Sequence, residues 1–303
     1  MLNISSFLGQ TTRLSAVGSL AAILLNAAAA SAQPPLNSAS TFAVLAGGQA
    51  AGAATCTGPG SVTGNVGVVP IGTFVNTGCT IVGTVDPFAA VPYADFLTAY
   101  GRLKSSTSTP CGATLNPAVS QTLAPGVYCV AAAAAFTGVT FTLNGPPSGV
   151  WIFKIGTGGT GALTGTGFSV AMAGGGKPCN VYWWVAQGAT MTGSLLKGTI
   201  LAGADITSTD SILKGGALAG GTGVTAAPTG AVTLTRSLVS ACGLGGTFPP
   251  VDKCEASGDD DHGKDKDKDD KDHKDNDHKD NDHKDKDKDK DKDHDSKDKK
   301  KSH

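Results

Sequence analysis

Acidic and basic side chains are scarce in the first 258 residues, and histidine is absent from them. Residues 33–258 contain six carboxylates and eight basic residues, whereas residues 259–303 contain 19 Asp, 15 Lys and all six His. The chain therefore combines a nearly neutral body, rich in Gly, Ala and Thr, with a polyelectrolyte tail. Without histidine the body cannot hold a Ser-His-Asp or Cys-His catalytic set. We expect a protein that is not an enzyme and uses no cofactor.

The few charged and glycine-rich segments of the body also argue against other common sites. Asp205 and Asp210 are close in sequence, and we interpret them as turn-stabilising residues rather than an acid–base pair. The glycine clusters lack the Gly-Lys-Ser/Thr that a phosphate-binding loop requires. Cysteine pairs of the Cys-x-x-Cys type are missing as well, so we expect no metal site.

Long apolar runs are limited to the N-terminus. The run Leu14–Ala30 follows Arg13 and leads into Ala30-Ser31-Ala32, which fits the small-x-small rule for signal-peptide cleavage. We predict a signal peptide over residues 1–32. A membrane anchor is the alternative, but a span needs roughly 20 strongly apolar residues and this run is rich in alanine. The mature protein is therefore expected to be secreted, extracellular and without a membrane span.

Seven cysteines are expected to meet an oxidising environment and to form disulfides. Cys56 with Cys79 and Cys111 with Cys129 would each close a short loop, so these are the candidate pairs. The spacing alone leaves the connectivity open. An odd number leaves one thiol over, and Cys254 is the candidate for it.

Residues 33–243 are predicted to form one mostly β domain. Short apolar, β-prone segments alternate with Gly and Asn turns, which is typical of an all-β fold. The clearest predicted strands are Phe42–Leu45, Val127–Val130, Thr137–Leu143, Val150–Ile155, Asn180–Val185, Thr199–Leu201 and Ala231–Thr235.

An internal repeat and one helix refine this architecture. The segment 196–203 (LKGTILAG) recurs as 213–220 (LKGGALAG), an offset of 17 residues that is close to one coil of a β-solenoid. Between residues 88 and 104, apolar side chains recur at helical spacing and predict a helix that packs against the solenoid. Pro92 and Gly101 are expected to kink or shorten it. Its apolar stripe consists of Tyr93, Phe96, Leu97, Tyr100 and Leu103.

Several segments resemble the microbial ice-binding (antifreeze) protein domain, in the same order along the chain. They are residues 36–47 (LNSASTFAVLAG), 62–68 (VTGNVGV), 123–129 (LAPGVYC), 150–156 (VWIFKIG), 179–183 (CNVYW) and 230–234 (GAVTL). The resemblance covers about residues 36–240. It implies a right-handed β-solenoid of roughly triangular cross-section, wound discontinuously, with one α-helix packed alongside. Lys154 and Trp184 depart from the small or neutral polar residues that are more common in the family.

The resemblance also implies a partner, the surface of an ice crystal. Threonine suits such a surface because its hydroxyl anchors a water molecule while its methyl group favours ordered hydration. A Thr-x-Thr pair in a strand points both side chains to one face, about 6.7 Å apart, and neighbouring coils lie about 4.8 Å apart. We therefore expect a flat face rich in Thr, Ser and Ala to adsorb to ice and inhibit crystal growth and recrystallisation. The candidate pairs are Thr140/Thr142, Thr164/Thr166, Thr190/Thr192, Thr207/Thr209 and Thr233/Thr235. The alternative is an exported structural or adhesive cell-surface solenoid without ice affinity.

The tail, residues 259–303, is a low-complexity string that follows a linker at 244–258. It alternates Lys and Asp and has no core-forming residues, so it is expected to be disordered. A solvating role, weak capture of divalent metals and attachment to cell-surface or matrix polymers are the competing interpretations. Nucleic-acid binding is not expected, because neighbouring Asp residues neutralise the lysines.

Overall fold

The computed structural model describes residues 33–47, 53–69, 72–221 and 230–242. The predicted signal peptide, linker and tail lie outside these residues, and so does Cys254. Within the described part, no helix is long and apolar enough to cross a membrane.

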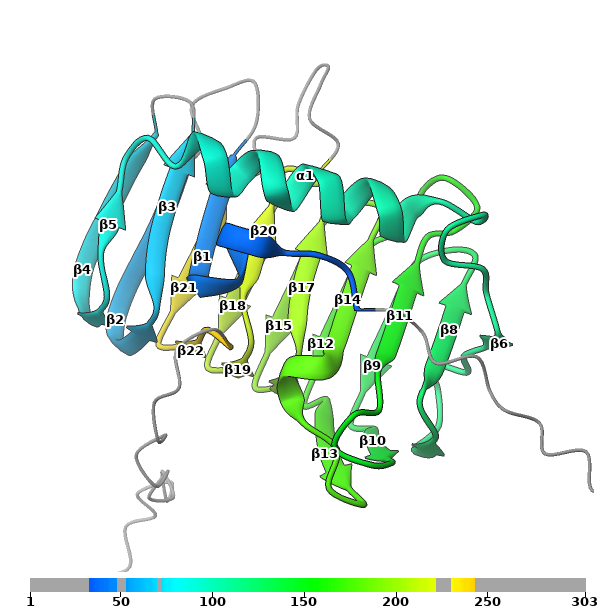
Figure 1. The fold of residues 1–303 in the computed structure, drawn as a ribbon. Coiled ribbons are helices and arrows are strands. Elements are labelled where there is room, and N and C mark those ends of the chain that lie inside the picture. The colour runs from blue at the N-terminus through cyan, green and yellow to red at the C-terminus, as the bar shows by residue number, and fades with distance from the viewer. Residues whose placement is uncertain (1–32, 48–52, 70–71, 222–229, 243–303) are drawn as a thin grey trace, which may run out of the picture. The chain divides into compact units, whose positions relative to one another are not determined.

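Short parallel strands stack into a β-solenoid with one helix alongside, as the sequence predicted (Figure 1). Nine strands form one continuous sheet, which we call the helix-side sheet because α1 covers it. In spatial order it consists of β5 (Val85–Asp86), β3 (Asn65–Val69), β1 (Phe42–Gly47), β20 (Ala217–Ala219), β17 (Thr199–Ala202), β14 (Val181–Val185), β11 (Trp151–Ile155), β8 (Gly126–Val130) and β6 (Ala113–Thr114).

A second sheet supplies the other two faces, because the long strands β2 (Ala53–Thr63) and β4 (Thr73–Val82) continue from one face to the next. The threonine face consists of the first halves of β4 and β2, followed by β21 (Val232–Thr235), β18 (Ile206–Thr209), β15 (Ala189–Thr192), β12 (Leu163–Thr166) and β9 (Ala134–Thr137). The third face consists of the second halves of β4 and β2, followed by β22 (Leu238–Ser240), β19 (Ile212–Lys214), β16 (Leu195–Lys197), β13 (Ser169–Ala173), β10 (Thr140–Asn144) and β7 (Gln121–Leu123).

The solenoid is wound discontinuously. The N-terminal strand β1 pairs with β20, and β2 pairs with β21 and β22, so the first coils stack on the last ones. Two short 3-10 helices, η1 (Asn37–Thr41) and η2 (Pro178–Asn180), precede β1 and β14. This winding brings residues of the N-terminal fifth of the chain beside residues 232–240.

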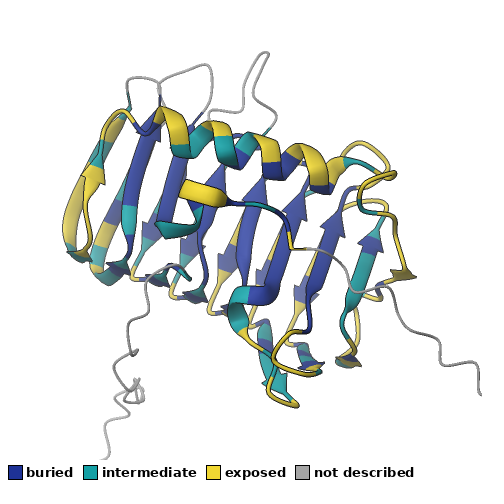
Figure 2. Cartoon of the chain, in the orientation of Figure 1, coloured by how far each residue is buried: buried dark blue, intermediate teal, exposed yellow. Residues whose placement is uncertain are grey.

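Two apolar clusters hold the fold together (Figure 2). One fills the inside of the solenoid, where the rings of Phe153 and Trp183 stack with centroids 4.1 Å apart and Phe136 and Phe168 pack nearby. The other lies between the helix-side sheet and α1. Strands β11 and β14 are therefore buried on both sides, which explains why their sequences are apolar without alternation.

Helix α1 (Ala90–Lys104) confirms the predicted helix and its packing stripe. Pro92 falls in the first turn, where a proline removes no helical hydrogen bond, and Gly101 lies inside the helix without ending it. Phe96, Tyr100 and Leu103 are buried against the helix-side sheet, with Tyr93 and Leu97 partly buried beside them. The helix therefore shields the one sheet whose outer side is apolar.

Lys154 and Trp184 both lie on the helix-side sheet, beside each other in register. Lys154 is 1% exposed, and its Nζ donates hydrogen bonds to the carbonyl oxygens of Ser105 (3.3 Å) and Thr109 (2.7 Å). These carbonyls follow the C-terminus of α1, where a cation is favourable. Burial lowers the pKa of Lys154 below its ordinary value. Both residues that depart from the family pattern therefore lie where α1 packs on the helix-side sheet.

Three disulfides cross-link the described residues. Cys56–Cys79 and Cys111–Cys129 confirm the two candidate pairs. The third, Cys179–Cys242, joins η2 to the segment after β22. Sequence spacing did not point to this pair because it links residues 63 positions apart.

Candidate functional site

Two columns of outward-facing side chains run along the threonine face, perpendicular to its strands. Strand registers align them residue by residue. From β4 to β9, the first column reads Val75, Thr55, Thr233, Thr207, Thr190, Thr164 and Ala135. The second column reads Thr77, Thr57, Thr235, Thr209, Thr192, Thr166 and Thr137. We call these two columns the threonine ladder.

The ladder is open to solvent while the residues between its members point inward. Thr164, Thr166, Thr190 and Thr192 are exposed, and the threonines of β18 and β21 are half-buried. Met191 and Leu234, which lie between the two threonines of β15 and of β21, are buried. Neighbouring strands of a sheet lie about 4.8 Å apart, so the threonines form a regular grid.

Four of the five predicted Thr-x-Thr pairs meet on this ladder, namely those of β12, β15, β18 and β21. Thr140 and Thr142 do not, because they lie on β10 in the third face. The predicted strand Thr137–Leu143 is in fact two strands. Gly138 separates them with a φ of 63°, which turns the chain through a corner. Thr137 therefore belongs to the ladder and Thr140 does not.

Thr55 and Thr57 extend the ladder onto β2, although they are not among the predicted pairs. They form a Thr-x-Thr pair with the inward-facing Cys56 between them, so the same signal could have found them. Thr77 and Thr137 carry no such signal because their partners in the first column are Val75 and Ala135.

A residue in the left-handed conformation follows the second threonine of each coil. Glycine occupies this corner at positions 58, 78, 138, 167 and 193, whereas Asp210 and Arg236 occupy it in two neighbouring coils. The corner N–H donates to the second-column carbonyl of the next coil, for example from Gly193 to Thr209 (3.0 Å) and from Arg236 to Thr57 (2.9 Å). These bonds fix the spacing of the second column.

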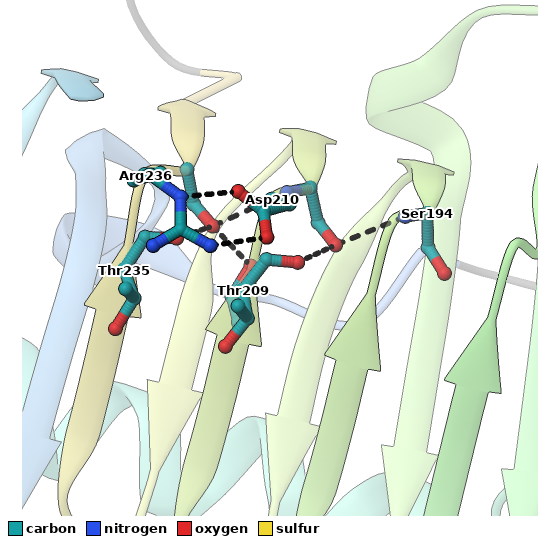
Figure 3. Close-up of polar contacts among 8 residues, drawn as sticks. Ser194, Thr209, Asp210, Thr235 and Arg236 are labelled. Carbon is teal, nitrogen blue, oxygen red and sulfur yellow. Dashed lines mark hydrogen bonds and ion pairs between the residues drawn. The ribbon is translucent and has the colours of Figure 1, made fainter. Parts of the chain in front are cut away.

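Buried serines reinforce the same corner from inside (Figure 3). Ser211 Oγ donates to the Thr209 carbonyl at 2.8 Å and accepts from the Ser194 N–H at 3.0 Å. Ser237 Oγ likewise donates to the Thr235 carbonyl at 3.0 Å and accepts from the Ser211 N–H at 3.3 Å. Each serine thus satisfies a buried backbone group in its own coil and in the next one.

One ion pair lies beside the ladder, between Asp210 and Arg236 (Figure 3). Arg236 Nε and Nη2 donate to the two carboxylate oxygens of Asp210 at 2.6 and 2.5 Å. The hydrogen bond and the charge of Arg236 hold the pKa of Asp210 below its ordinary value. Since the opposite charges pair with each other, the ladder and its corner carry no net charge. Asp205 accepts a hydrogen bond from the Ala231 N–H at 2.8 Å, so it too holds a turn.

The other features of the described residues are weaker candidates for a functional site than the ladder. Among the described residues, no three His, Cys, Asp or Glu side chains come together in a group that could hold a metal ion. A cavity of about 460 Å³ lies between the segment 33–42 and η2. Its most buried amide, that of Asn180, already bonds to Gln33 and to the Pro147 carbonyl. The ladder is therefore the candidate site.

Comparison with known proteins gives concordant matches. A family model described as ice-binding-like matches residues 48–240. An ice-binding protein of Nostoc sp. (strain HG1) is 32% identical over 185 residues, which cover 57% of this chain and 63% of that protein. The alignment thus spans less than two thirds of the length of that relative.

Solved structures match the same region. The crystal structure of an ice-binding protein from an Antarctic biological consortium is 30% identical, with a TM-score of 0.59 over 69% of this chain and 91% of that chain. An ice-binding protein from the Antarctic ascomycete Antarctomyces psychrotrophicus is 27% identical, with a TM-score of 0.57 over 69% of this chain and 98% of that chain.

Proposed function

The chain belongs to the ice-binding-like family, and on this premise we propose that it is a secreted protein that adsorbs to ice through the threonine ladder. Adsorption would limit crystal growth and recrystallisation. The observation that carries the proposal is the alignment of threonines in two columns across successive coils.

The chemistry of the ladder suits frozen water better than a dissolved ligand. Ice presents hydrogen-bond donors and acceptors at fixed spacing and no charge to pair with. Each threonine offers one hydroxyl, which can donate and accept, beside a methyl group that is poorly hydrated. A rigid grid needs no reordering of side chains on binding, because β-branched threonine has few rotamers. The site therefore supports binding of a surface and not a catalytic step.

Secretion is part of the proposal and is supported by two observations. The first 32 residues have the pattern of a signal peptide. The three disulfides are of a kind that persists in oxidising compartments. Mass spectrometry of the protein recovered from the culture medium of its host should find a chain that begins at Gln33.

A pair of matched substitutions tests the ladder. Thr190→Tyr places a bulky ring in the first column between Thr164 and Thr207, and it should abolish thermal hysteresis and recrystallisation inhibition because the flat grid is interrupted. Thr142→Tyr makes the same change on the third face and should leave both activities intact. Circular dichroism melts of the two variants would confirm that each is folded.

Two results would contradict the proposal. Full activity of folded Thr190→Tyr would show that ice meets another face. Unaltered ice growth in the presence of the wild-type protein would favour the alternative, a structural or adhesive solenoid.

A further inference from the structure

The solenoid ends at β4 with an open sheet edge. Strand β4 pairs with β2 along nine registered positions from Ala53↔Thr73 to Thr63↔Val82. Among the described residues, no strand pairs with its other side. In Figure 1, β4 and β5 lie at the end of the row of coils. The backbone N–H and C=O groups on this side can therefore pair with a strand from another molecule.

Most of the large apolar side chains that are exposed among the described residues belong to β4 and to the segment that follows it. Seven large apolar side chains are exposed among the described residues, and five of them lie between positions 75 and 91. They are Val75, Val82, Val85, Phe88 and Val91, with exposures from 45% to 70%. Val75 and Val82 lie on β4 and Val85 lies on β5, the strands at this end of the row of coils.

The edge also lacks the features that keep edge strands apart. Natural edges are usually protected by charged side chains, above all lysine, or by proline. Residues 73–85 contain neither a charged residue nor a proline, and β4 is ten residues long. Strand β4 is thus a long, neutral edge of the kind that associates.

Val75 stands in the first column of the threonine ladder, beside Thr55. A valine cannot anchor water as threonine does, but it is a favourable residue for a cross-strand apolar pair. It is 50% exposed. At the opposite end of the column the corresponding residue is the small Ala135. The two ends of the ladder therefore differ, and only the β4 end presents a β-branched apolar side chain.

We propose that this end binds a second copy of the chain, through antiparallel pairing of Thr73–Thr77 with the same segment of the partner across a two-fold axis. Such an axis places Val75 opposite Val75 of the partner subunit. Position 75 is then the one that meets its own copy, so a charge there would face an identical charge and destabilise the pair. The absence of charge from residues 73–85 makes this edge self-complementary and gives a charged partner nothing to pair with. In a two-fold contact the β4 edges of both copies are occupied, so no third copy can pair with this edge.

The geometry of the dimer has a consequence for ice binding, and this consequence rests on the proposed function. A two-fold axis that pairs a strand antiparallel with its copy in one sheet is perpendicular to that sheet, so outward side chains of both copies point the same way. The two threonine ladders then lie in one continuous face, and the dimer presents twice the ordered surface of one chain.

Sedimentation of the full chain with matched lysine variants tests the dimer. All proteins carry Cys254→Ser, which removes the cysteine outside the described disulfides as a source of covalent dimers. The parent should sediment as a dimer at micromolar concentration. Val75→Lys should halve the measured mass, because it puts two ammonium groups opposite each other. Ala135→Lys makes the matching change in the same column at the other end and should remain dimeric.

A covalent trap supplies a second measurement that does not depend on the lysine variant folding. In the same background, Val75→Cys should form an intermolecular disulfide on mild oxidation, and Ala135→Cys should not. A parent that sediments as a monomer over the whole micromolar range, or equal cross-linking at positions 75 and 135, would overturn the inference. Neither measurement involves ice, so a dimer without ice activity refutes the proposed function alone, and an active monomer refutes the dimer alone.

Discussion

At the scale of single residues, Tyr100 makes the stability of the contact between α1 and the helix-side sheet depend on pH. It is 3% exposed between the helix and the helix-side sheet, and its hydroxyl donates to the Val185 carbonyl at 3.2 Å. Burial raises its pKa well above the ordinary value of 10.0. Burial also raises the pKa of Tyr182 on the same sheet, to about 12. Both phenols therefore stay protonated in the folded protein at pH values where the unfolded chain ionises.

This raised pKa predicts that stability falls in alkaline solution. Above pH 10 the unfolded state binds fewer protons than the folded state, so the free energy of unfolding decreases by about 1.4 kcal/mol per pH unit for each such tyrosine. Tyr100→Phe should make the decrease shallower by about that amount, since one ionisable group is removed. Urea unfolding of both proteins at several pH values from 8 to 11.5 measures the two slopes. Parallel slopes would show that Tyr100 ionises equally in both states.

Single residues also mark the limit of sequence reasoning about the site. The Thr-x-Thr spacing correctly selected eight members of the ladder, because alternation along a strand puts both threonines on one side whatever the fold. It also selected Thr140 and Thr142, which are equally regular in sequence but lie past the corner at Gly138. Spacing within a strand reports which side a residue faces, but not which face of the solenoid the strand belongs to.

At the scale of elements, the corners between strands depend on backbone conformation more than on packing. Gly193 has a φ of 57°, and a Cβ built there would meet no atom within 4 Å. The cost of a side chain at this corner is therefore conformational and not steric. Asp210 and Arg236 adopt this left-handed conformation in neighbouring coils despite its cost, and their ion pair joins the two corners.

Two alanine substitutions of opposite sign follow from this difference. Gly193→Ala should destabilise the protein by about 1–2 kcal/mol, because an L-residue is strained in the left-handed region. Gly101→Ala, inside α1, should stabilise it by about 0.5–1 kcal/mol, because alanine is a better helix former and its Cβ also meets nothing within 4 Å. Chemical denaturation of both variants gives the two values. Changes of the same sign would mean that packing, not conformation, decides these positions.

Elements were predicted well where a local pattern is unambiguous. The helix follows from the stripe around Phe96 and Tyr100, which needs a 3.6-residue period. The long strand β4 had no such pattern, since the segment TFVNTGCTIV mixes polar and apolar residues on an exposed edge. Its length comes from pairing with β2, which is a tertiary contact.

At the scale of the whole molecule, Cys179–Cys242 ties the segment after β22 to η2 and spans 63 positions of the chain. In the loop-entropy description a disulfide restricts the unfolded state more as the closed loop grows. The double variant Cys179→Ser/Cys242→Ser should therefore lose about 4 kcal/mol, against about 3 kcal/mol for Cys111→Ser/Cys129→Ser, which opens a loop of 18 positions. Guanidinium unfolding under oxidising conditions provides both numbers. A larger loss for the shorter loop would show that native contacts around Cys111 outweigh chain entropy.

The sequence by itself determined the chemistry of this protein. A body almost without charge or histidine, with a 17-residue repeat, predicted a neutral β-solenoid, and these properties depend only on residue type and local periodicity. The resemblance to ice-binding domains, together with threonines at two-residue spacing, predicted a surface that binds through hydroxyl and methyl groups. Tertiary structure decided which threonines stand together, because the discontinuous winding puts Thr55 beside Thr233 and the corner at Gly138 removes Thr140. It also decided where the ladder ends, since an open edge is a property of strand order and not of any one segment.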